Sequence, residues 1–446
     1  MGWSPLEKLL NMNTGIRNKL FLMMVLEFFI WGAWLPLIFG YLPAMGLSEA
    51  EQKLILSAFP VAAIIGMFFS NQFADRNFAA EKFMSFSHLV GGLAIAGLAF
   101  VKFARPVAIE AGAVVPALWD TSFWIFFALM SLHCLLYVPT ISIANSIAFS
   151  HMKSADKEFG FVRMGGTVGW ILAAWPIAYI LHGKAAGEIV NATGSIFLIS
   201  GVASIILAIF SLTLPHTPAN KGAGSDSLAW LKAGKLLAIP AIFILFIATL
   251  IDATIHNGYF VMAGGFISKS LTSAKIDPAW TTVVMSLGQV AEILTMLILG
   301  KVLAKFGWRT TLIVGILGHT ARFLIFAFFP SATPLIVLVQ LLHGICYAFF
   351  FATVYIYIDA VFPKDIRTSA QGLFNFLILG IGDLAAKWIF IPLSGKYLTG
   401  NGFEGYRELF LVPVGMSLVA VILLALFFRP PAFGPAQDAA PAPTPH

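Results

Sequence analysis

Two polar side chains inside an apolar stretch are the residues of this chain whose types and spacing point most directly to chemistry. In the run MSLGQVAE, Gln289 and Glu292 lie three positions apart and therefore on one face of a helix. An ionisable group at membrane depth is costly unless it faces a cavity, a partner or a substrate. An amide offers both a donor and an acceptor to the edge of a base or a carboxamide. The pair predicts that the protein binds or moves a polar molecule within a bilayer.

A second apolar stretch, FLMMVLEFFIWGAWL, carries Glu27, Trp31 and Trp34 at the i, i+4, i+7 spacing of one helix face. A carboxyl group beside two indoles suits a cavity wall that binds a ring and exchanges a proton. The alternative is that Glu27 hydrogen-bonds a neighbouring helix and that the tryptophans anchor the helix at the membrane interface. The depth of the three residues within the stretch favours the cavity.

The stretch FGFVRMGGTVGW repeats this spacing with Arg163, Thr167 and Trp170. A permanently charged guanidinium inside a span needs an acidic partner or polar ligand atoms. The alternative is that Arg163, close to the end of its span, extends to the membrane surface. Gly165, Gly166 and Gly169 on the same helix would permit a second helix to approach closely.

A further stripe, in LIDATIHNGYF, consists of Asp252, His256 and Tyr259, with Asn257 beside it. A lone histidine in an apolar helix is usually a satisfied core residue, but a histidine can also titrate near neutral pH. The aspartate one turn away from His256 favours a functional interpretation.

The aromatic run CYAFFFATVYIYID places Tyr347 and Phe351 one turn apart, where both are candidates for stacking on a ring. Further along the chain, Asp383 and Lys387 are four positions apart and are expected to neutralise each other.

The elements that would position these side chains are membrane helices. Of the 446 residues, 59% are hydrophobic and 11% are charged, which is more apolar surface than a soluble chain could bury. A membrane helix needs about 20 apolar residues. Twelve such stretches recur, at approximately 20–44, 53–74, 83–104, 121–150, 160–182, 190–214, 236–266, 279–304, 309–330, 333–361, 369–397 and 406–429. The sequence predicts an all-α, polytopic membrane protein.

The stretches fall into two halves of six. The polar segment LPHTPANKGAGSDS begins at Leu214 and has the composition of a linker. We expect an N-terminal bundle over 1–214, a cytoplasmic linker over 215–235, a C-terminal bundle over 236–429 and a disordered tail over 430–446. Two six-helix bundles joined by a polar linker form the major facilitator architecture, in which the substrate cavity lies between the halves.

Basic residues are unevenly distributed among the expected loops. With a cytoplasmic N-terminus, sixteen Lys and Arg fall on the inside and eight on the outside, and Arg163, Arg322 and Lys387 lie within spans. This bias predicts that both termini are cytoplasmic. It also accounts for the net charge of +6 without a nucleic-acid partner.

Several kinds of site are missing from the sequence. Cys134 and Cys346 both lie in apolar spans, and their spacing is neither that of a metal site nor that of a disulfide framework. The sequence has no nucleotide-phosphate loop, zinc-binding helix motif or nucleophile elbow. We therefore expect no enzyme activity, no metal and no cofactor.

Six motifs, spread in order along the chain, together resemble the nucleoside:proton symporter family of major facilitators. They are EFFIWGAW (27–34), LYVPT (136–140), RMGGTVGW (163–170), LTLPH (212–216), MSLGQVAE (285–292) and IRTSAQG (366–372). The resemblance implies import of nucleosides, coupled to proton entry, across a bacterial inner membrane by a monomer working through alternating access. Nucleosides, protons and the lipid bilayer would be its partners.

The resemblance also implies substrate-site positions. Arg163, Thr167, Gln289 and Glu292 match such positions. On the span over 236–266 the best match is Asn257, with Thr254 and Tyr259 as alternatives. Stacking on the base would then fall to aromatic residues, for which the candidates are Trp34, Tyr347 and Phe351.

The chain departs from the family pattern at the proton site. Relatives carry an acid where this chain has Ala348, and often Gln at the position of Glu27. The proton would then be carried by Glu27, Asp252 or Glu292. The alternatives to nucleoside symport are proton-coupled transport of another solute, such as a sugar or glycoside, drug/proton antiport, and a solute-sensing receptor that has lost transport.

Overall fold

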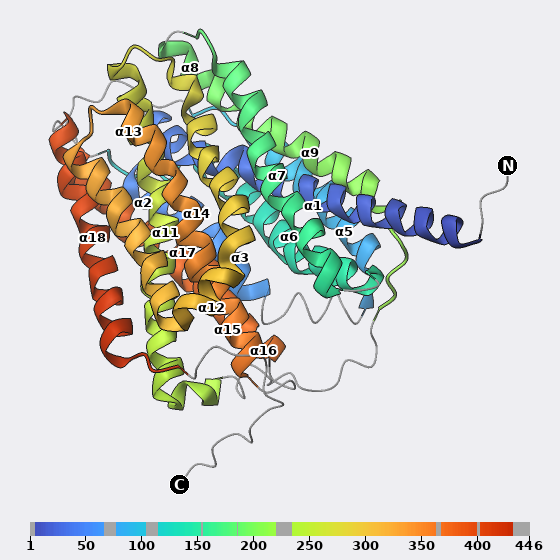
Figure 1. Cartoon of the computed structure of the whole chain (residues 1–446). Helices are drawn as coiled ribbons and strands as arrows, with labels where there is room; N and C mark the ends of the chain where they lie inside the picture. The colour runs from blue at the N-terminus through green and yellow to red at the C-terminus, as the bar shows by residue number, and fades with distance from the viewer. Residues whose placement is uncertain are drawn as a thin grey trace. The chain divides into compact units, whose positions relative to one another are not determined.

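The computed structural model describes residues 5–66, 77–103, 115–152, 155–184, 186–219, 234–362, 367–398 and 402–430 (Figure 1). Within these ranges every regular element is a helix, and no strand is formed. This agrees with the predicted all-α class.

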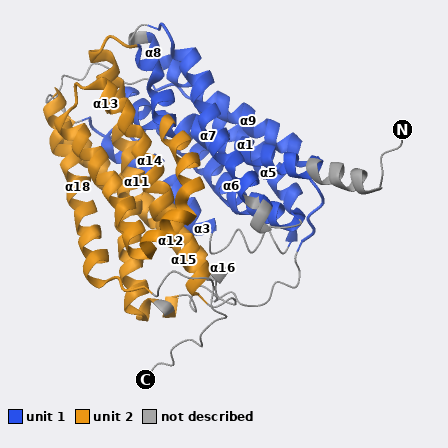
Figure 2. Cartoon of the chain, viewed as in Figure 1, with its two compact units in different colours: residues 1–223, 277–286 blue, residues 224–276, 287–446 orange. Residues whose placement is uncertain are grey.

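The chain divides into two compact units (Figure 2). Unit 1 consists of residues 1–223 and 277–286, and unit 2 of residues 224–276 and 287–446. The division at 223/224 falls within the expected linker. Residues 220–233 of that linker, and residues 431–446 of the expected tail, lie outside the described residues.

Unit 1 is built mainly from five long helices and three short ones. They are α1 (Pro5–Ala44), α2 (Glu49–Leu56), α3 (Ala58–Ile65), α5 (Ala80–Leu98), α6 (Thr121–His151), α7 (Ala155–Leu181), α8 (Ala186–Thr193) and α9 (Ser195–Ser211). The short helix η3 (Pro278–Trp280) and the first residues of α12 also belong to this unit.

Unit 2 contains the remaining helices, several of them interrupted. They are η2 (Leu236–Ala238), α11 (Pro240–Ser273), α12 (Thr281–Phe328), α13 (Thr333–Leu338), η4 (Val339–Leu341), α14 (Leu342–Cys346), η5 (Tyr347–Ala352), α15 (Thr353–Val361), α16 (Arg367–Asn375), η6 (Phe376–Ile381), α17 (Gly382–Leu398) and α18 (Gly402–Phe427). Two of these, η5 and η6, are single π-helical turns, which are frequent at functional sites.

Nine helices in the described ranges are long and apolar enough to cross a membrane. One of them, α12, joins the predicted spans 279–304 and 309–330 and is broken at Gly307, whose φ of 70° is favourable for glycine. The predicted spans 53–74 and 83–104 are not among the nine. The first is divided between α2 and α3, and part of it lies outside the described residues. The count of twelve spans therefore stays a prediction.

Helix ends are fixed by local hydrogen bonds. Ser48 and Glu51 form a capping box at the start of α2, in which each side chain accepts the other residue's backbone N–H. Oε1 of Glu51 also accepts the backbone N–H groups of Leu118 and Trp119, at 3.3 and 3.2 Å. Asp120 then caps α6 by accepting the N–H of Phe123 at 2.8 Å. Hydrogen bonds to the Glu51 carboxylate therefore connect α2 to the segment just before α6.

Helices α1 and α7 pack with their backbones in direct contact. A Cβ atom added at Gly165 would lie 2.5 Å from the carbonyl oxygen of Phe21, and one at Gly169 would overlap the carbonyl of Val25. The prediction that these glycines permit close helix approach is confirmed. Arg163, on the same helix, contacts the ring of Phe28 on α1.

Candidate functional site

A cluster of buried polar side chains lies inside unit 2, with Arg322 of α12 at its centre. Nη1 of Arg322 lies 3.0 Å from Nδ1 of His343, and Nη2 lies 3.1 Å from Nδ1 of His319. The guanidinium carbon is 4.0 Å from the centroid of the Tyr259 ring. All four side chains are buried. The cation is therefore held by two imidazole nitrogens and an aromatic face.

Asp252 of α11 belongs to the same cluster. Its Oδ1 lies 3.8 Å from Nε2 of His319, which is too long for a hydrogen bond. Both carboxyl oxygens are buried and have no hydrogen-bond partner in the part of the chain that the structure describes. An ionised carboxylate at this position lacks the hydrogen bonds that normally offset burial. Asp252 is chemically suited to accept a proton.

Gln289 is brought against the cluster by the close packing of α12 and α14. Its side-chain amide lies 3.2 Å from Nε2 of His343, and its buried amide oxygen has no partner among the described residues. A Cβ atom at Gly288 would lie 2.8 Å from Cβ of His343, and one at Gly344 would overlap the backbone of α12. Glu292, on the next turn after Gln289, is half-buried. The predicted pair therefore lies where α12 meets α14, with Gln289 joined to the arginine cluster.

On α11, Asn257 is better placed for a ligand than either alternative. Its Nδ2 donates to the carbonyl oxygens of Ala253 at 2.9 Å and Ile378 at 3.1 Å, so both amide hydrogens are used and the carbonyl oxygen is the group it can offer. The Tyr259 hydroxyl donates to Oε1 of Gln340 at 2.7 Å, and its ring is covered by the guanidinium.

The remaining alternative on α11, Thr254, is 3% exposed, and its hydroxyl donates to the backbone carbonyl of Leu250 at 2.8 Å. Like Tyr259, it has a partner within its own unit.

The aromatic candidates of η5 lie together beside a histidine. The ring centroids of Tyr347 and Phe351 are 5.9 Å apart. The half-buried His256 ring lies 5.0 Å from Phe351, edge to face, and is stacked 5.0 Å from His343. Ala348 of the same π turn is fully buried and packs in the apolar core of unit 2. No carboxyl group is present at that position.

In unit 1, Arg163 and Thr167 are half-buried on α7, one turn apart. The guanidinium carbon of Arg163 lies 4.3 Å from the centroid of Phe28 on α1. The face of an aromatic ring attracts a cation, which helps to hold the guanidinium within the helical bundle. The roles of Arg163 and Thr167 at a substrate stay predictions.

The tryptophans of α1 differ in how much ring surface they present. Trp34 is 1% exposed and contacts His133 edge to face, with centroids 6.4 Å apart. The half-buried Trp31 stacks on Phe59 at 4.7 Å and meets Trp170 edge to face at 5.4 Å. Trp31 and Trp170 are therefore better placed than Trp34 to stack on a substrate.

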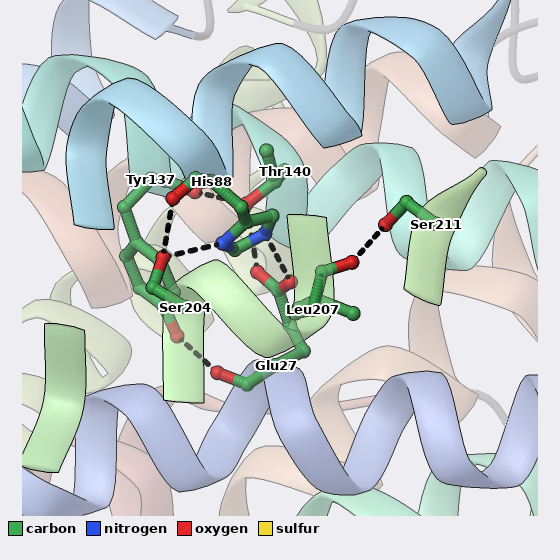
Figure 3. Close-up of polar contacts among 7 residues, drawn as sticks. All are labelled: Glu27, His88, Tyr137, Thr140, Ser204, Leu207 and Ser211. Atoms are coloured by element: carbon green, nitrogen blue, oxygen red, sulfur yellow. Dashed lines mark hydrogen bonds and ion pairs between the residues drawn. The ribbon is translucent and has the colours of Figure 1, made fainter. Parts of the chain in front are cut away.

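Glu27 lies in a second buried network, inside unit 1 (Figure 3). Its Oε1 accepts the Thr140 hydroxyl at 2.8 Å, and its Oε2 lies 2.9 Å from Nε2 of His88. Nδ1 of His88 is 3.1 Å from the Ser204 hydroxyl. The fully buried carboxyl group thus joins helices α1, α5 and α6. This arrangement matches the alternative interpretation, in which Glu27 is a hydrogen-bonding group between helices.

These networks contain an arginine, three histidines and a serine that were not predicted from the sequence: Arg322, His88, His319, His343 and Ser204. Arg322 carried a usable signal, because an arginine inside a span needs a partner as much as a glutamate does. The histidines carried none, because a histidine in an apolar helix does not disclose its neighbours. The expected pair of Asp383 and Lys387 is confirmed as a buried ion pair on α17.

The fold is that of the major facilitator superfamily of membrane transporters. The crystal structure of the nucleoside transporter NupG matches with a TM-score of 0.76 at 22% identity, over 93% of this chain and 99% of that one. The proton:xylose symporter XylE, of the major facilitator superfamily, matches with a TM-score of 0.62 at 12% identity, over 94% and 97%. The prediction of this fold is confirmed.

Sequence comparison defines the family within that fold. A family model described as Nucleoside H+ symporter matches residues 12–107 and 102–432. The putative nucleoside transporter YegT of Escherichia coli K12 is 29% identical over 92% of this chain and 93% of its own length. The xanthosine permease of the same organism is 27% identical over 93% and 96%. This chain belongs to the nucleoside H+ symporter family, and it is a multi-pass, proton-coupled nucleoside transporter.

Proposed function

We propose that this chain imports nucleosides across a bacterial inner membrane, each with a proton, by alternating access and as a monomer. The family match over nearly the whole chain is the observation that carries the proposal. The excess of Lys and Arg in the expected inner loops supports an orientation with both termini in the cytoplasm.

The polar side chains predicted from the sequence would bind the nucleoside. In unit 2 these are Gln289, Glu292 and Asn257, which combine donors and acceptors suited to a base edge and a ribose. In unit 1 they are Arg163 and Thr167. The half-buried Glu292 and Asn257 lie on different helices of unit 2, and this supports a site formed by several helices.

Asp252 would be the residue that carries the proton. Two observations support it over Glu27: the carboxyl oxygens of Asp252 have no hydrogen-bond partner among the described residues, whereas both oxygens of Glu27 are occupied. Protonation removes the charge from a buried carboxylate and so lowers the cost of excluding water from it. A proton on Asp252 would then favour the closed states through which the transporter passes.

The test is uptake of labelled uridine by vesicles reconstituted with the protein, under an imposed pH gradient. Nucleoside symport gives accumulation driven by the gradient, drug antiport gives extrusion of a drug, and a receptor gives binding alone. A competition panel of nucleosides, free bases and sugars then defines the substrate.

The Gln289→Ala variant tests the binding site directly. Loss of a hydrogen bond in a dry site costs about 1–3 kcal/mol, so uridine affinity should fall roughly tenfold to a hundredfold. Gln52→Ala is the matched control, because the Gln52 amide, in α2, donates to the backbone carbonyl of Leu47 and lies outside the cluster. Wild-type affinity in the folded Gln289→Ala protein would refute the assignment.

A further inference from the structure

The hydrogen bonds of Arg322 determine the tautomer of two histidines. A guanidinium has five N–H donors and no acceptor. The Nδ1 atoms of His343 and His319, at 3.0 and 3.1 Å from it, must therefore accept with their lone pairs. Protonation of either Nδ1 would direct an N–H group at a cation inside a buried cluster. Both imidazoles are therefore neutral and carry their one hydrogen on Nε2.

This tautomer decides which end of the Gln289 amide faces His343. The structure places the amide nitrogen of Gln289 3.2 Å from His343 Nε2, so that two donors would meet, while the buried amide oxygen has no partner among the described residues. A half-turn about the terminal torsion of Gln289 exchanges the nitrogen and the oxygen, a choice that only the hydrogen-bond network can settle. The oxygen then accepts the Nε2–H of His343, which removes the contact between two donors. The NH2 group takes the buried position that has no partner among the described residues.

We propose that Arg322 and His343 are positioning residues that turn the NH2 group of Gln289 toward the substrate. The site would therefore select a hydrogen-bond acceptor on the nucleoside, such as a base carbonyl or a ribose oxygen. This inference rests on the proposed function, which places the substrate at Gln289. Neither Arg322 nor His343 touches the ligand in this arrangement, and both act through the amide.

The two glycines of this helix contact make the arrangement possible. The Cβ atom of His343 occupies the space that a side chain at residue 288 would need, and Gly344 lets the backbones of α12 and α14 touch. His343 is 3% exposed and Arg322 is fully buried, so water does not compete for their hydrogen bonds.

Two substitutions at one position separate positioning from packing. In His343→Gln, the longer amide can place an N–H donor near the former Nε2 and an oxygen toward Arg322. In His343→Asn, the side chain ends near the former Nδ1 and cannot reach Gln289. We expect the uridine Kd of His343→Gln to stay within about threefold of wild type, and that of His343→Asn to rise roughly tenfold to a hundredfold. Equal affinities in the two folded variants would overturn the proposal.

A double mutant sharpens this comparison. If His343 acts only through Gln289, His343→Asn should weaken binding no further when Gln289→Ala is already present. Additive losses in the double mutant would contradict the proposed route.

A measurement without substrate makes the proposal independent of the transport assay. In protein labelled with 15N on its histidine rings, two-bond 1H–15N spectra distinguish the tautomers, and the His343 signals are assigned by their loss in His343→Gln. We expect the Nε2–H tautomer, and an Nδ1–H tautomer would overturn the inference. The expected tautomer in a protein that binds no nucleoside would instead refute the proposed function and, with it, the ligand role of Gln289.

Discussion

Replacement of Asp252 by asparagine tests whether this residue carries the coupled proton. Asparagine has nearly the same shape but cannot titrate. The change removes one carboxyl group and therefore one protonation site from the buried cluster. One proton that moves down a gradient of one pH unit supplies about 1.4 kcal/mol, which supports roughly tenfold accumulation of a neutral solute at zero membrane potential. Without that proton the accumulation ratio should be about one.

The assay compares two modes of transport in the same vesicles. Wild-type protein should concentrate labelled uridine about tenfold for each pH unit imposed. Asp252→Asn should still exchange labelled for unlabelled uridine but should not concentrate it. Tenfold accumulation by the variant would refute the reasoning and would move the proton to Glu27 or Glu292.

Asp383→Asn is the matched control, because it also neutralises a buried aspartate of unit 2. Asp383 pairs with Lys387, so its removal leaves a buried cation without a partner. Such a loss typically costs about 3–5 kcal/mol of stability. We expect the control protein to melt earlier and its folded fraction to keep normal coupling. This contrast separates loss of a proton site from loss of structure.

The remaining predictions concern unit 1. Glu27→Gln should lower the melting temperature but leave the pH profile of uptake unchanged, because its oxygens serve hydrogen bonds between helices; a shifted profile would return it to the proton pathway. Gly169→Ala should reduce the yield of folded protein, measured by size-exclusion chromatography, because the added methyl group overlaps the carbonyl of Val25. Gly160→Ala is the control and should not reduce the yield, because Gly160 is exposed and has open space around it. Burial raises the pKa of Glu81, but hydrogen bonds from the Thr217 backbone N–H and from His216 outweigh it and hold the pKa below its usual value. Its contribution to thermal stability should therefore persist above pH 4.5 and be lost as pH falls through the lowered pKa, a loss that Glu81→Gln should not show.

The sequence by itself determined the class of protein and most of its helices. Apolar stretches of membrane length require long helices, because a helix forms all of its backbone hydrogen bonds within itself inside a bilayer. The polar segment between the two halves indicated two bundles. Local spacing was also sufficient for Asp383 and Lys387, which lie one turn apart on a single helix. The glycines of α7 likewise predicted a close helix contact, but they did not predict that the partner helix is α1.

Only the tertiary structure decided which polar groups meet. Glu27 was predicted to line a cavity, yet it lies against His88, a residue 61 positions away on α5. Gln289 was identified from its own helix, but the histidine beside it comes from α14 and the arginine beyond it from the far half of α12. Helical periodicity specifies which side chains share a face of one helix, but it contains no information about which other helix packs against that face. The orientation of the Gln289 amide and the unpartnered oxygens of Asp252 arise from helices packed against one another, and a single helix cannot reveal them.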